Sequence, residues 1–85
     1  MINVGVNAKE TGKKIRKLMD MRGLNVVAVR EACGLESSQA IYKWLRGDSM
    51  PSIDNLVVLR TVLDVPIDEI LVCDDWDGEV LPDAG

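Results

Sequence analysis

Hydrophobic residues recur every three or four positions along most of the chain, a spacing typical of amphipathic helices. Polar residues and glycines interrupt this pattern and divide it into short segments. The pattern predicts five helices, over residues 8–22, 26–33, 38–46, 53–63 and 67–72. No strand pattern is comparably strong, so we expect an all-α fold, a compact bundle of five helices.

Residues that commonly cap helices mark the ends of these segments. Four side chains are expected to cap helix N-termini: Asn7, Asn25, Ser37 and Ser52. Glu10 stands three residues after the first of them, the spacing of a capping box. Three glycines follow the first three helices, where a left-handed residue often ends a helix: Gly23, Gly34 and Gly47. Pro66 is tolerated at the start of the fifth.

The core is expected to be aliphatic, because the chain has no Phe, one Tyr and two Trp. In the third helix, Ile41, Trp44 and Leu45 stand at positions i, i+3 and i+4 and are expected to face inward. The other helices add Ile15, Leu18, Met19, Ile53, Leu56, Leu59, Leu63, Ile67, Ile70 and Leu71 to the predicted core. Both cysteines, Cys33 and Cys73, are expected to be reduced, buried thiols, and a disulfide between them is the less favoured alternative.

The second and third predicted helices are joined by a short turn, residues 34–37, that contains a glycine. Two helices linked in this way cross steeply, which is the helix-turn-helix geometry. The second helix of such a pair projects one face away from the bundle. Four polar residues at positions i, i+3, i+4 and i+7 define that face here: Gln39, Tyr42, Lys43 and Arg46.

These side chains have the chemistry that a DNA major groove requires. Gln39 can pair in bidentate fashion with an adenine edge, and Lys43 or Arg46 can reach guanine or phosphate. Tyr42 offers a hydroxyl for phosphate and a ring for a thymine methyl. Ser37 and Ser38, with the free N–H groups of the helix start, can hold a phosphate oxygen. A solvated surface face with no ligand is the alternative interpretation of the same pattern.

The net charge of −4 is an average over two unlike halves. Through Arg60 there are ten basic and six acidic residues, which gives +4. From Thr61 onward there are eight acidic residues and no basic one, which gives −8. Such asymmetry indicates a nucleic-acid surface followed by an acidic tail.

Several classes of protein are disfavoured by what the chain lacks. It has no histidine and no CxxC pair, which excludes the usual zinc spacings and histidine-based catalysis. It has neither a GxSxG nucleophile motif nor a phosphate-binding loop, so we expect no enzyme activity, no cofactor and no small-molecule ligand. No apolar run is long enough to cross a membrane and no secretory signal begins the chain, which favours a cytoplasmic protein.

Between Ile15 and Leu71, three stretches carry a resemblance to a known family: IRKLMDMRGLNVV, GLESSQAIYKWLRGDSMPSIDNLVVL and LDVPIDEIL. Together they resemble the lambda-repressor-like DNA-binding domains of the Cro/XRE type. The resemblance implies a five-helix all-α fold that contains a helix-turn-helix. It further implies sequence-specific binding of double-stranded DNA, usually as a homodimer on a palindromic operator, and transcriptional regulation, most often repression.

Carried over by position, this resemblance assigns contacts to particular residues. Ser38, Gln39, Tyr42 and Lys43 fall where the family reads base edges and adjoining phosphates. Arg46 and Ser49 fall where the DNA backbone is held, and Ser52 and Asn55 fall where the fourth helix approaches a phosphate. The full predicted DNA-binding set is Asn25, Ser37, Ser38, Gln39, Tyr42, Lys43, Arg46, Ser49, Ser52 and Asn55.

Three departures from the family pattern weaken the expectation of tight DNA binding, and the first of them, together with the acidic net charge, motivates an alternative function. The second helix starts Asn25-Val26-Val27, without the glutamine that commonly clamps a phosphate there. Arg30 occupies a mid-helix place where a small residue is common, and Glu36 lies in a turn that is one residue longer. The alternative is a protein-interaction module of the same fold, antirepressor-like or antitoxin-like, with weak or no DNA binding.

We expect three parts along the chain: an arm at residues 1–7, the helix-turn-helix domain at 8–73 and an acidic tail at 74–85. The alternation of Ile2, Val4 and Val6 is compatible with a short extended arm. For the tail, docking on the body or on a second subunit, disorder, and autoinhibition are three alternatives. A basic cluster in the first helix serves either long-range attraction to DNA or solvation alone: Lys13, Lys14, Arg16 and Lys17.

Overall fold

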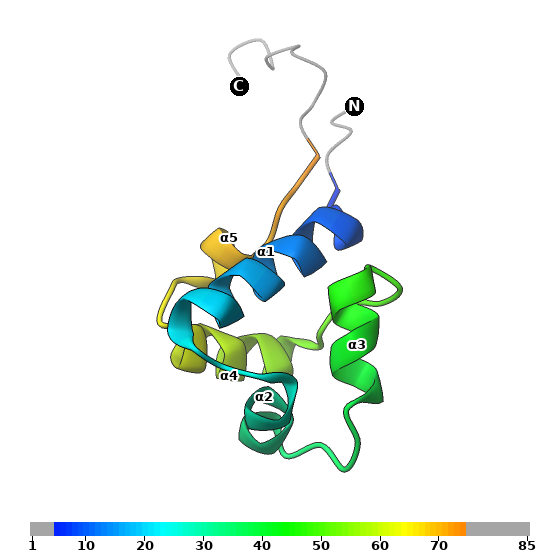
Figure 1. Ribbon diagram of the computed structural model, residues 1–85. Coiled ribbons are helices and arrows are strands. Elements are labelled where there is room, and N and C mark those ends of the chain that lie inside the picture. The colour runs from blue at the N-terminus through cyan, green and yellow to red at the C-terminus, as the bar shows by residue number, and fades with distance from the viewer. Residues whose placement is uncertain (1–4, 75–85) are drawn as a thin grey trace, which may run out of the picture.

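Five helices follow one another in the computed structural model, which describes residues 5–74 (Figure 1). They are α1 (Ala8–Arg22), α2 (Val26–Cys33), α3 (Gln39–Arg46), α4 (Ile53–Leu63) and α5 (Ile67–Ile70). Within the described residues, the only β-pairing is an isolated antiparallel bridge between Val6 and Cys73. The all-α, five-helix prediction is therefore confirmed.

The helix ends are set by the side chains that the sequence predicted, with two exceptions. Asn7 Oδ1 accepts from the Glu10 N–H at 2.9 Å, Asn25 Oδ1 from Ala28 N–H at 2.8 Å, and Ser52 Oγ from Asn55 N–H at 3.2 Å. The reciprocal half of the predicted capping box does not form. The Glu10 carboxylate instead pairs with Lys13 Nζ at 3.2 Å, and the Asn7 N–H donates to the Val72 carbonyl at 2.7 Å.

The second exception is α3, which begins one residue later than predicted. Ser38, not Ser37, holds the N-cap position, and its backbone is already helical, with φ −85° and ψ 0°. This conformation differs from the extended backbone that usually directs a cap side chain toward the helix. No side-chain cap forms at Ser38, and Ser37 Oγ lies 3.5 Å from the Gln39 N–H.

Every helix contributes to one hydrophobic core. Its buried members are Ile15, Leu18, Met19, Val29, Ile41, Trp44, Leu56, Leu59, Leu63 and Ile70. The predicted inward orientation of Ile41 and Trp44 is confirmed, since their exposed fractions are 0% and 3%. The prediction for Ile53 is wrong: this side chain is 74% exposed, because it lies on the first turn of α4, beyond the end of the packed stripe.

The two cysteines are free thiols in different environments. Cys33 is half-buried and packs against the core, and this burial raises the pKa of its thiol above the ordinary value. The predicted burial of Cys73 is wrong, because it is exposed in the surface bridge to Val6.

Polar contacts join the segment after α5 to α1 and to the residues that precede α1. The Thr11 side chain is fully buried, and its hydroxyl oxygen accepts from the Val72 N–H at 2.9 Å. Asp74 N–H donates to the Gly5 carbonyl at 2.8 Å, beside the bridge to Val6. These contacts give the chain an extended course after Leu71, which is why α5 ends at Ile70 and not at 72 as predicted. Ile2 and Val4, the remainder of the predicted extended arm, lie outside the described residues, as does the tail beyond Asp74.

The backbones of α1 and α3 approach each other closely. A Cβ atom at Gly12 would clash with the Trp44 carbonyl oxygen and lie 2.7 Å from that of Leu45. At Gly47, which has φ +82°, a Cβ atom would lie 2.6 Å from Lys9 Cα. Both positions therefore require glycine, the first for space and the second for both space and conformation.

We expect Gly12→Ala to lower the free energy of unfolding by about 1–3 kcal/mol, the usual cost of overpacking a rigid site. Alanine ordinarily stabilises a helix interior relative to glycine by about 0.5–1 kcal/mol, so the sign of the change is diagnostic. Urea unfolding followed by circular dichroism measures it. Gly5→Ala is the control, because nothing lies within 4 Å of a Cβ atom there. A Gly12→Ala protein as stable as wild type would contradict the close approach.

Candidate nucleic-acid interface

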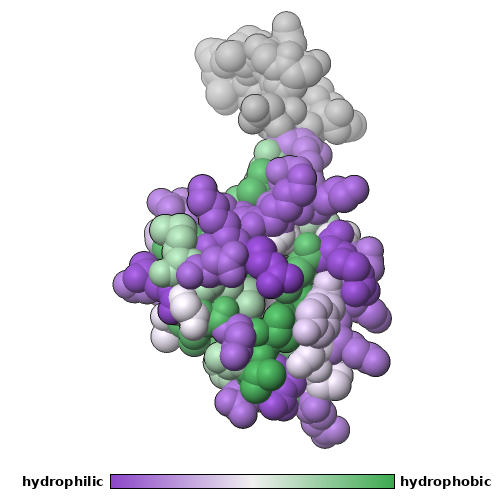
Figure 2. Space-filling view, viewed as in Figure 1, coloured by the Kyte–Doolittle hydropathy of each residue, from purple (hydrophilic) through white to green (hydrophobic). Residues whose placement is uncertain are grey.

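Four polar side chains gather on the outer side of α3. Gln39, Tyr42, Lys43 and Arg46 are exposed and together line a surface hollow of about 390 Å³. Figure 1 shows α3 at the edge of the bundle, and Figure 2 shows hydrophilic surface along that edge. Because Ile41 and Trp44 are buried on the opposite side, the polar face is directed to solvent. The predicted grouping of these four residues on one face is thus present in the structure.

The turn that precedes α3 is held by an unexpected residue. Arg30 stands where the family pattern has a small side chain, and its guanidinium reaches the backbone of the turn. Its Nη1 donates to the Leu35 carbonyl at 3.1 Å, and its Nη2 lies 3.7 Å from the Glu31 carboxylate. Arg30 therefore stabilises the longer turn, in which Glu36 is exposed.

At the other end of α3, Arg46 is already engaged. Its Nε donates to Asp48 Oδ2 at 2.8 Å, within the turn that follows Gly47. The Asp48 and Ser49 N–H groups both donate to the Lys43 carbonyl, at 2.9 and 3.4 Å, which closes this turn. The two side chains of the pair are 59% and 56% exposed, so the ion pair is weak and readily exchanged.

The remaining residues of the predicted set lie at helix starts outside this hollow. Ser37 is exposed and Ser38 half-buried in the turn before α3. Asn25 and Ser52 cap α2 and α4 through their side-chain oxygens. The N–H groups of the Asn25 amide and the O–H of Ser52 are not used in these caps and are able to donate to a phosphate. Asn55 is half-buried one turn into α4. Contacts of these residues with DNA remain predictions.

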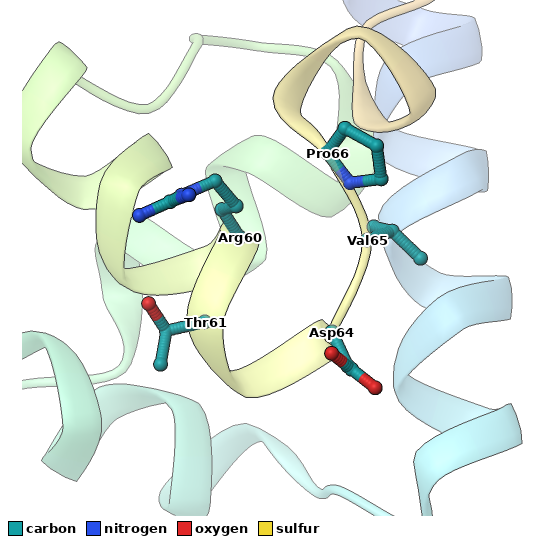
Figure 3. Close-up of a pocket in the computed structure, with 5 residues that line it drawn as sticks. All are labelled: Arg60, Thr61, Asp64, Val65 and Pro66. Atoms are coloured by element: carbon teal, nitrogen blue, oxygen red, sulfur yellow. The ribbon is translucent and has the colours of Figure 1, made fainter.

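A second hollow, of about 420 Å³, lies at the turn from α4 to α5 (Figure 3). It is lined by Arg60, Thr61, Asp64, Val65 and Pro66. Arg60 and Asp64 point away from each other, and Asp64 lies 3.7 Å from the Arg22 guanidinium. With no converging polar groups, this hollow lacks the features of a ligand site.

Residues 5–74 contain neither a metal-binding cluster nor a membrane-spanning helix. That part of the chain contains no group of three or more histidine, cysteine or acidic side chains placed to bind a metal. None of its helices combines the length and apolar character needed to span a bilayer.

Comparisons with known proteins agree with this geometry. A family model described as helix-turn-helix matches residues 15–70. Among solved structures, the restriction-modification controller protein C.AhdI from Aeromonas hydrophila is similar, with a TM-score of 0.66 and 25% sequence identity. That similarity covers 74% of this chain and 94% of the other. A search of curated proteins found no match. The expected family and fold are confirmed.

The pairing of Arg46 with Asp48 leads to a prediction. If Arg46 must leave Asp48 to reach a phosphate, Asp48→Asn should strengthen binding of duplex DNA. The expected gain is up to roughly fivefold at low salt, the equivalent of the 0–1 kcal/mol of an exposed ion pair. Fluorescence anisotropy with a labelled duplex measures it, and Asp20→Asn, at an exposed position on α1 outside the proposed contacts, removes the same charge as a control. Equal or weaker binding by Asp48→Asn would contradict this role of the ion pair.

Proposed function

The chain belongs to the helix-turn-helix family, and from this premise we propose that it is a sequence-specific DNA-binding transcriptional regulator, a repressor. The observation that carries the proposal is the polar face of α3, whose opposite side is anchored in the core by Ile41 and Trp44. The description of the similar structure as a controller protein agrees with a regulatory role. The proposal includes no enzyme activity, and it assigns the protein to the cytoplasm.

The proposed mechanism places α3 in the major groove, which is wide enough to admit a helix. Gln39 donates to and accepts from the edge of an adenine, and Lys43 donates to a guanine edge. Tyr42 packs its ring against a thymine methyl or donates its hydroxyl to phosphate. Arg46 exchanges its Asp48 partner for a phosphate, and a repressor bound in this way excludes other proteins from the same stretch of DNA.

The helix starts supply the proposed backbone contacts. Ser37 and Ser38 lie beside the N-terminal end of α3, where free N–H groups and the helix dipole favour an anion. Ser52 and Asn55 serve the same purpose at α4, with Asn25 at α2 and Ser49 in the turn after α3. Such contacts fix the register of the protein on DNA, while the base contacts supply the sequence preference.

The family resemblance implies a homodimer, and α4 offers a surface for it. Ile53 and Val57 lie one turn apart and are 74% and 44% exposed. We assign this apolar face to a second copy of the chain, which would place two α3 helices on successive half-sites. The half-sites would lie about 34 Å apart, one turn of DNA, and the operator would be palindromic.

A protein-interaction module is the second candidate, supported by the exposed Glu36, whose negative charge lies in the turn beside the proposed phosphate contacts. Retention on random duplex DNA discriminates between the two. Non-specific attraction is strongest at low salt, so a DNA-binding protein should be retained at about 50 mM salt and released as salt rises. Absence of binding at the lower concentration would favour the interaction module.

For base recognition, we expect Gln39→Ala to reduce discrimination at one base pair by roughly 1–3 kcal/mol, because a bidentate contact is lost. Selection of bound sequences from random DNA, performed with both proteins, measures the change. Arg46→Ala is the comparison, since losing a phosphate contact should weaken binding to all sequences and lower the salt slope by about one. Unchanged selectivity in Gln39→Ala would reject the assignment of Gln39.

For assembly, we expect the double substitution Ile53→Glu and Val57→Glu to convert dimers to monomers, because it places charge in an apolar contact. Sedimentation velocity at micromolar protein measures the change. Met21→Glu is the control, because Met21 is a hydrophobic side chain on α1 that is 68% exposed. A double variant that remains dimeric would exclude this face as the interface.

A further inference from the structure

The first turn of α1 lies against the end of α3, and this contact brings another cation to the interface. A Cβ atom at Gly47 would lie 2.6 Å from Lys9 Cα and 3.1 Å from Lys9 Cβ. The backbone of Lys9 is therefore in direct contact with Gly47, the residue that follows Arg46. Figure 1 shows the same juxtaposition, with the N-terminal end of α1 beside the C-terminal end of α3.

Lys9 lies near three acidic side chains that each have another partner. It is exposed, and the ion pairs of residues 5–74 do not include it. Its acidic sequence neighbour, Glu10, pairs with Lys13 at 3.2 Å, while Asp48 beyond Gly47 pairs with Arg46 at 2.8 Å. Asp74 lies at the same end of α1, where its Oδ1 accepts from the Asn7 side-chain amide at 2.9 Å. Lys9 thus adds a positive charge next to Lys43 and Arg46, which stand in the last turn of α3.

We propose that Lys9 binds the DNA phosphate backbone at the C-terminal end of α3, as an anchor supplied by α1. A helix in the major groove is flanked by a phosphate strand on each side, and Ser37 and Ser38 serve the strand near its other end. The N-terminal end of α1 adds the partial positive charge of a helix dipole at the same place. The proposal rests on the proposed function, because it requires α3 to lie in the groove.

The close contact at Gly47 is what makes Lys9 suitable as an anchor. Any side chain at Gly47 would separate the backbones of α1 and α3, so glycine fixes the position of Lys9 relative to Lys43 and Arg46. The ammonium group of a lysine whose backbone is placed in this way contributes a point charge to phosphate without reading sequence. The expected signature is a change in salt dependence that is equal for specific and random DNA.

The test compares Lys9→Gln with Lys17→Gln, which removes the same charge from an exposed site on α1 about 12 Å further along the helix. Affinity for a selected duplex and for a random duplex is measured by anisotropy from about 50 to 200 mM salt. Loss of one phosphate contact lowers the slope of log affinity against log salt by about 0.9, so the fall in affinity over this range becomes roughly threefold smaller. We expect this for Lys9→Gln on both duplexes, no change for Lys17→Gln, and restoration by Lys9→Arg.

An unchanged slope in Lys9→Gln, with wild type still binding, would overturn this inference and leave the proposed function standing. An equal change in Lys17→Gln would also overturn it, because it would indicate general attraction by α1 in place of a contact. Absence of duplex binding by wild type at about 50 mM salt would overturn both proposals. Thermal unfolding of each variant verifies that the fold is retained.

Discussion

The arrangement of the interface depends on how closely the backbones of α1 and α3 approach each other. Gly12 faces the carbonyl oxygens of Trp44 and Leu45, and Gly47 faces the backbone of Lys9. Neither helix can move toward the other, and the core side chains Ile41 and Trp44 hold α3 from the same side. The close contact and the buried side chains together place α3 with its polar face directed outward.

Several groups at the surface combine a structural role with the proposed DNA contacts. Asn25 and Ser52 cap their helices with their side-chain oxygens, so the proposed DNA contacts use their side-chain N–H and O–H donors. Arg46 pairs with Asp48 in the turn after α3. A phosphate that replaces Asp48 would bind an Arg46 side chain that this ion pair already positions. Only a weak, exposed ion pair would be lost in the exchange.

The N- and C-terminal ends of the described chain meet on α1, where Thr11 binds the peptide of Val72 through its hydroxyl. This buried contact places the basic start of α1 and the beginning of the acidic C-terminal region in the same part of the molecule. The basic and acidic parts of the sequence therefore lie close together in space where residues 5–7 contact residues 72–74.

The sequence by itself determined the number, order and approximate bounds of the helices, because helical periodicity and capping side chains act over a few residues. It also determined that Gln39, Tyr42, Lys43 and Arg46 share a face, since that follows from helix geometry alone. Only the tertiary structure decided the contacts between distant residues: the glycine-dependent approach of α1 to α3, the burial of Thr11 against Val72, and the place of Lys9 beside Gly47. It also decided that Ile53 and Cys73 are exposed, because burial depends on which elements cover a position, and local periodicity does not specify them.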